Sequence, residues 1–122
     1  MFGEIYSLDL TKHTNPSKFT IKDNHMVLVV TRDFGPNFPI ANILPITSFK
    51  KHKHWDQNNN RLKYFHNYKI EKSIYKKLQK DSIVDCAQIF TIDRKYLGKK
   101  HFSLNYHDKE EIKKRLAFVL DM

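Results

Sequence analysis

The chain of 122 residues has one cysteine, three glycines and four prolines. A single cysteine excludes an intramolecular disulfide framework and a zinc site built on cysteines. So few glycines and prolines exclude collagen-like and Pro/Gly-rich low-complexity chains. No stretch approaches the roughly 18 apolar residues of a membrane span. Glu4 stands where a signal peptide carries Lys or Arg, so we expect a cytoplasmic protein without a membrane segment.

Enough apolar and aromatic side chains are present for one core. Hydrophobic residues make up 40% of the chain and aromatic residues 13%, and the length suits a single domain over residues 1–122. The 22 Lys and Arg exceed the 13 Asp and Glu, which gives a net charge of +9. That excess favours an anionic partner, meaning nucleic acid, an acidic protein or a membrane surface. The charge alone does not choose among them.

The positive charge is concentrated in residues 49–80, which have ten Lys and Arg against two acids. Trp55, Tyr64, Phe65 and Tyr68 alternate with these cations. Cations beside exposed rings are typical of proteins that bind single-stranded nucleic acid. The alternative is that the rings pack in the core or at its edge while the lysines face solvent. Trp55 favours the first interpretation, because its neighbours are too polar to bury it easily.

Alternating and β-branched segments predict about five strands, at residues 3–10, 26–34, 40–46, 62–70 and 81–93. The unbroken apolar run in 26–34 predicts a strand buried on both faces. Residues 11–23 are polar and predict a long loop, whereas 72–79 and 93–97 predict short helical turns, the second ending at Gly98. Cys86 lies in an apolar run, so we expect a buried thiol.

The last segment predicts an amphipathic C-terminal helix. Asp108 is a candidate N-cap, and Glu111 three residues later would complete a capping box. Ile112, Leu116 and Val119 then recur at helical spacing. The predicted fold class is therefore α+β, a curled antiparallel sheet with helices packed at one side.

Four segments in this order resemble the MazF/PemK family of toxin ribonucleases. The family has a G-[DE]-[IV]-[YW] strand, an apolar second strand, a P-[IV]-T-S corner and a D-S-x-[IV]-x-x-x-Q segment that continues to T-I-D. This chain has the matching residues Gly3 to Tyr6, Val27 to Val30, Pro45 to Ser48, Asp81 to Val84, Gln88, Ile89, Thr91 to Asp93 and Leu97. The resemblance runs from Gly3 to the C-terminal helix.

This resemblance implies a small SH3-like antiparallel β-barrel with a C-terminal helix that is usually a homodimer. Members cut single-stranded RNA by attack of the 2′-OH, without a metal or other cofactor. They are normally encoded beside an antitoxin, and an acidic antitoxin segment would suit a basic groove. The resemblance therefore implies the toxin of a type II toxin-antitoxin system, an endoribonuclease.

Two departures from the family pattern affect the chemistry. The family has Arg-Pro before its second strand where this chain has His25 and Met26, and Phe90 stands where a later Arg is usual. The family pairs the first Arg with the Thr of the P-x-T-S corner, and Thr47 matches that partner. We expect His25 to take an acid–base or cationic role and Thr47 to hydrogen-bond the scissile phosphate. The alternative is that His25 is an ordinary loop residue and activity is lost.

Further residues are expected to bind RNA. They follow Thr47 in the basic segment or lie in the first long loop: Ser48, Lys50, Lys51, His52, Lys53, His54, Trp55, Arg61, His13 and Lys18. His52 and His54 would share one face of a strand, with His66 further along the chain, but no spaced Cys or acidic third ligand accompanies them, so we predict no metal.

The sequence is also compatible with two other functions. One is a non-catalytic nucleic-acid- or protein-binding module on the same barrel. The other is a toxin that acts on DNA gyrase.

Overall fold

A computed structural model describes residues 1–9 and 25–122 of the chain. His13 and Lys18 lie outside these residues. Seven strands of the described part form one antiparallel sheet: β1 (Glu4–Leu8), β2 (Met26–Val29), β3 (Ile40–Ser48), β6 (Asn67–Ile70), β7 (Ser82–Asp85), β8 (Phe90–Asp93) and β9 (Leu97–Ser103). The helices are α1 (Lys51–His54), the 3-10 turn η3 (Arg94–Tyr96) and α2 (Tyr106–Val119), and β4 (Trp55–Asp56) pairs with β5 (Arg61–Leu62). The α+β fold class is confirmed.

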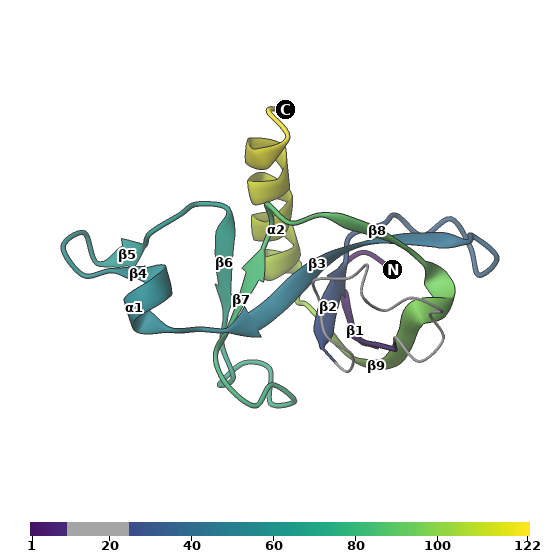
Figure 1. The fold of residues 1–122 in the computed structure, drawn as a ribbon, viewed down its shortest axis with the longest axis horizontal. Coiled ribbons are helices and arrows are strands. Elements are labelled where there is room, and N and C mark those ends of the chain that lie inside the picture. Colours follow the sequence, from purple (N-terminus) through teal and green to yellow (C-terminus); the bar gives the residue numbers. More distant parts are fainter. Residues whose placement is uncertain (10–24) are drawn as a thin grey trace.

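The long strand β3 joins the two halves of the sheet. The strand order is β6-β7-β3-β2-β1-β9, and β8 also pairs with β3. Residues 40–43 of β3 pair with β8, whereas residues 46–48 pair with β7. Pro45 lies between these two stretches and pairs with neither β7 nor β8. Because proline has no N–H to donate, this position loses no hydrogen bond to those strands. The strands curl round one end of the molecule, and the arm formed by α1, β4 and β5 projects from the other (Figure 1).

The prediction of one strand over residues 81–93 is wrong, because a turn divides it into β7 and β8. Asp85 stabilises that turn: its Oδ1 accepts from the backbone N–H of Ala87 at 3.0 Å, and its Oδ2 accepts from the amide of Gln88 at 2.9 Å. An Asp side chain that binds the backbone two residues later is a common turn device. The turn contains no Gly or Pro, so the sequence pattern does not mark it.

Other boundaries also differ from the predictions. The strand expected over 26–34 ends at Val29, and the one expected over 62–70 includes only Asn67–Ile70. Residues 72–79 form turns without a regular helix. The predicted helical turn near 93–97 is η3, but β9 then begins at Leu97 and passes through Gly98.

The core has two clusters on opposite faces of β2. Val27 and Val29 belong to one cluster, Leu28 belongs to the other, and all three are fully buried. The prediction of a strand buried on both faces is therefore confirmed. Cys86 is also fully buried, as expected.

Helix α2 begins earlier than predicted, and Asp108 is not its cap. Asn105 is the N-cap residue, and its side chain accepts from the backbone N–H of Asp108 at 2.8 Å. Asp108 is buried within the first turn, where its carboxylate accepts hydrogen bonds from the hydroxyls of Tyr68 and Tyr75. The predicted capping box of Asp108 and Glu111 does not form, because Asn105 is the N-cap residue and Asp108 lies inside the helix.

The predicted amphipathic packing of α2 is confirmed at Ile112, which is fully buried, and at Leu116, which packs against the same cluster. Among the residues that the structure describes, no helix is long and apolar enough to cross a membrane.

Candidate functional site

The strand register sets the predicted catalytic pair side by side. Val27 pairs with Pro45 across β2 and β3, so the same register continued by two residues sets His25 opposite Thr47. Thr47 in turn pairs with Ile83 of β7. Residues directly opposite each other in an antiparallel pair point to the same face. The side chains of Thr47 on β3, Ile83 on β7 and His25 just before β2 therefore meet on one face of the sheet.

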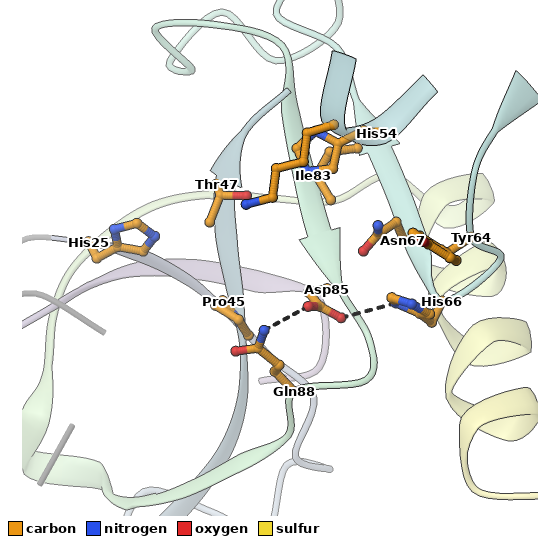
Figure 2. A pocket seen from close by; sticks show the side chains of 11 residues that line it. His25, Pro45, Thr47, His54, Tyr64, His66, Asn67, Ile83, Asp85 and Gln88 are labelled. Carbon is orange, nitrogen blue, oxygen red and sulfur yellow. Dashed lines mark hydrogen bonds and ion pairs between the residues drawn. The ribbon is translucent and has the colours of Figure 1, made fainter. Parts of the chain in front are cut away.

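A groove of about 600 Å³ lies over this face (Figure 2). It is lined by the residue before β2 and by residues from β3, α1, the segment before β6, β6, β7 and the turn after β7: His25, Pro45, Thr47, Lys53, His54, Tyr64, His66, Asn67, Ile83, Asp85 and Gln88. The groove brings together His25, Thr47, Lys53 and His54 from the predicted set. Its volume lies in the usual range of ligand sites.

Two neighbouring cavities extend the groove. One, of about 320 Å³, shares His25 and Thr47 with it and adds the predicted Ser48. The other, of about 600 Å³, shares Tyr64 and Asn67 with it and includes the predicted Trp55 and Arg61. The three cavities together form a path along the strand ends and the arm, which suits an extended ligand better than a compact one.

His54 is buried at the base of the arm. Its Nδ1 accepts from the backbone N–H of Lys50 at 2.9 Å, and its ring stacks on Phe49 with centroids 5.9 Å apart. Burial, assisted by the nearby charge of Lys53, lowers the pKa of His54 below its ordinary value. The neutral ring thus fixes the helical turn of the arm to Phe49 and Lys50, the segment that follows β3.

The remaining predicted residues lie on the exposed side of the arm. Lys50, Lys51 and His52 are exposed and do not line the three cavities. His52 and His54 are on a helical turn and not on a strand, so one ring is exposed and the other buried. Among the described residues, no group of three or more His, Cys, Asp or Glu side chains is placed to hold a metal ion.

Trp55 is half-buried, with its ring edge-on to Phe49 at 6.5 Å. The expectation that its polar neighbours keep Trp55 out of the core holds only in part.

One cluster in the groove was not predicted. His66 Nδ1 lies 3.3 Å from Oδ1 of Asp85, and the same carboxylate binds the Gln88 amide (Figure 2). The ring of His66 stacks on Tyr64 with centroids 5.4 Å apart and planes at 14°. The sequence carries no signal for this cluster, because it depends on the pairing of β6 with β7 and on the turn that ends β7.

The groove has two ends of different chemistry. His25 lies at one end, beside Thr47, and the His66 cluster lies at the other (Figure 2). The imidazole and hydroxyl groups at the first end can bind a phosphate, and the imidazole can exchange protons with it. Stacked rings and amides at the second end are groups that bind planar, hydrogen-bonding molecules.

The whole chain matches a known family. Residues 1–120 match the family model of the PemK-like, MazF-like toxin of type II toxin-antitoxin systems. The protein belongs to this family. None of the curated proteins compared by sequence matches the chain.

Solved structures of low sequence identity share the fold. Mycobacterium tuberculosis toxin MazF-mt6 superposes with a TM-score of 0.70 at 17% identity, covering 98% of this chain and 97% of that one. A mycobacterial endoribonuclease, solved in complex with its cognate antitoxin, gives 0.69 at 14% identity over 100% and 95%. MazF from Deinococcus radiodurans gives 0.67 at 15% identity over 99% and 96%. At these identities the likeness establishes the fold alone.

Proposed function

We propose that this protein is the toxin of a type II toxin-antitoxin pair and cleaves single-stranded RNA without a metal. The observation that carries the proposal is the meeting of His25, Thr47 and Lys53 in one groove, with His25 opposite Thr47 in the extended register. The family supports the toxin role, and the mycobacterial neighbour in fold is an endoribonuclease.

The proposed reaction is attack of a 2′-oxygen on the neighbouring phosphorus. The new bond joins that oxygen to phosphorus, the bond from phosphorus to the 5′-oxygen breaks, and the 2′-proton is lost while the leaving oxygen gains one. His25 exchanges one of these protons or stabilises the added charge, because imidazole donates and accepts near neutral pH. Thr47 donates its hydroxyl hydrogen to the phosphate, and Lys53 supplies positive charge.

The test is incubation of the purified protein with an RNA pool in the presence of EDTA. We expect shortened RNA with 2′,3′-cyclic phosphate ends, and His25→Ala should cleave about 100-fold more slowly. His107→Ala is the matched control, since His107 is exposed near the start of α2 and does not line the groove.

Two outcomes would contradict this proposal. RNA that is bound and left intact would favour the non-catalytic binding module, for which the replacement of the family's Arg by His25 is the specific argument. Wild-type cleavage by the His25→Ala variant would remove His25 from the chemistry.

The proposed partners are an acidic antitoxin and a second copy of the chain. The mycobacterial endoribonuclease was solved with its cognate antitoxin, and the exposed Lys50, Lys51 and Lys53 on the arm of this chain suit an acidic segment. A short reading frame for an acidic protein beside the gene would agree with this proposal. With RNA as substrate, the proposed location is the cytoplasm.

A further inference from the structure

At the end of the groove away from His25, an almost fully buried asparagine turns its side chain toward the cavity (Figure 2). Asn67 is only 7% exposed and lines the groove. Within residues 1–9 and 25–122, its side chain has no hydrogen-bond partner. The polar atoms of this amide remain accessible from the cavity, because among the described residues Arg115 Nε is the one fully enclosed side-chain polar atom without a partner. The N–H and the carbonyl of the Asn67 side chain are therefore both available to a ligand in the groove.

A stacking surface lies beside this amide. Tyr64 and His66 are nearly parallel, and Tyr64 is 56% exposed. Asp85 holds the His66 ring through Nδ1, and Asp85 is itself held by the N–H of Ala87 and the amide of Gln88. The rings are therefore fixed before a ligand arrives, which lowers the entropy cost of stacking a planar group on them.

The charge beside Asn67 favours a particular hydrogen-bond pattern. Asp85 is the direct cross-strand partner of Asn67, so its carboxylate lies next to any group bound by the amide. Adenine and cytosine present an amino group beside an unprotonated ring nitrogen, and the acceptor and donor of an Asn amide match this pair. Uracil and guanine present a carbonyl oxygen at the same place, which the carboxylate would repel.

We propose that Asn67, with the stacked rings of Tyr64 and His66, forms a nucleobase subsite that selects adenine or cytosine at one position of the RNA. The inference rests on the proposed RNA substrate and deepens it. Asn67 lies away from His25 and Thr47, so it decides which RNA is cut and does not take part in breaking the bond.

The first test compares cleavage sites in a random RNA pool for the wild type and Asn67→Ala. We expect the wild type to favour adenine or cytosine at one fixed distance from the cut, and Asn67→Ala to lose this preference at that position only. Asn58→Ala is the matched control, because Asn58 is exposed in the turn between β4 and β5. An unchanged preference in Asn67→Ala would overturn the subsite.

The second test measures binding and does not need cleavage. RNA with 2′-O-methyl groups cannot be attacked by its own 2′-oxygen. Exchange of the selected base for uracil or guanine should weaken binding to the wild type by about 5- to 100-fold, and binding to Asn67→Ala by less than about twofold. Equal binding of all four bases by the wild type would overturn the subsite even where the RNA pool is cut.

Two further variants guard against a folding defect. Asn67→Asp keeps the size of the side chain but lacks the amide donor, so it should also lose discrimination. Tyr64→Ala removes an exposed ring and should weaken binding about tenfold or more. Wild-type binding by Tyr64→Ala would contradict the stacking role. A wild type that binds the selected base but leaves RNA intact would refute the proposed cleavage and retain the subsite.

Discussion

Three histidines lie within one groove, and the contacts of each ring decide its role. His54 is buried and accepts a hydrogen bond from the backbone of Lys50. His66 is bound through Nδ1 to a carboxylate and stacked on Tyr64. His25 stands beside Thr47 at the other end of the groove. The residue type is the same each time, so only its surroundings separate a structural ring from a ligand-binding or proton-exchanging one.

The structural role of His54 predicts loss of stability in acid. Because burial lowers the pKa of His54 below 6.5, the unfolded chain binds a proton at this residue more readily than the folded chain. Stability should be fully present above about pH 6.5 and fall as the pH drops below it. His101, whose pKa is also lowered by burial, contributes in the same direction.

His54→Asn isolates this contribution. The amide oxygen of Asn can accept the Lys50 N–H but does not titrate, so the drop in melting temperature between about pH 7.5 and about pH 5.5 should be smaller than in the wild type. An equal drop in both proteins would show that His54 is not the titrating group.

At the scale of elements, a buried carboxylate fixes α2 to the sheet. Asp108 accepts hydrogen bonds from Tyr68 on β6 and from Tyr75 in the segment between β6 and β7. Burial and the neighbouring carboxylate raise the pKa of both tyrosines above their usual range. One side chain thus joins the helix, the strand and the connecting segment, and that strand also carries Asn67, which lines the groove.

Asp108→Ala should lower the free energy of unfolding by about 2–3 kcal/mol, because two hydroxyls lose a charged acceptor. Chemical denaturation measures this change. Glu110→Ala is the control: its ion pair with Lys113 is partly exposed, so its removal should cost less than about 1 kcal/mol. A similar loss in both variants would contradict the special role of Asp108.

At the scale of the whole molecule, the net charge of +9 is distributed unevenly. Residues 49–80 have ten cations against two acids, and Lys50, Lys51 and Lys53 are exposed on the arm. Other cations of the segment take part in internal contacts: Lys69 pairs with Asp81 at 3.8 Å, and Lys63 donates to the carbonyl of His52. Because Lys53 also lines the groove, the arm brings part of this exposed charge to it.

If the arm binds RNA phosphates, affinity should fall steeply with added salt. The triple variant Lys50→Gln, Lys51→Gln and Lys53→Gln should reduce the slope of log affinity against log salt by about 2. Binding of 2′-O-methyl RNA at several salt concentrations measures it. Lys99→Gln, Lys113→Gln and Lys114→Gln together remove the same charge from exposed positions on β9 and α2. Equal slopes for the two triple variants would mean that net charge alone governs binding.

The candidate site was only partly predictable. The family resemblance supplied Thr47 and the position of His25, and the basic composition of residues 49–80 supplied Lys53. His66, Asn67 and Asp85 were not identified as one cluster, because they meet only when β6 pairs with β7. The sequence does not predict that pairing, because residues 81–93 have the pattern of one continuous strand. The residue types of β7 and β8 are alike on both sides of the turn that separates them.

The sequence by itself determined the fold class, the doubly buried β2 and the presence of the C-terminal helix. These depend on local periodicity and on the apolar content of short segments. Tertiary structure decided which strand lies beside which, where Asn105 and Asp108 stand at the start of α2, and which histidine is buried. The physical reason is that such contacts join residues far apart in the chain, so the partners of a side chain are set by the packed sheet and not by its neighbours in sequence.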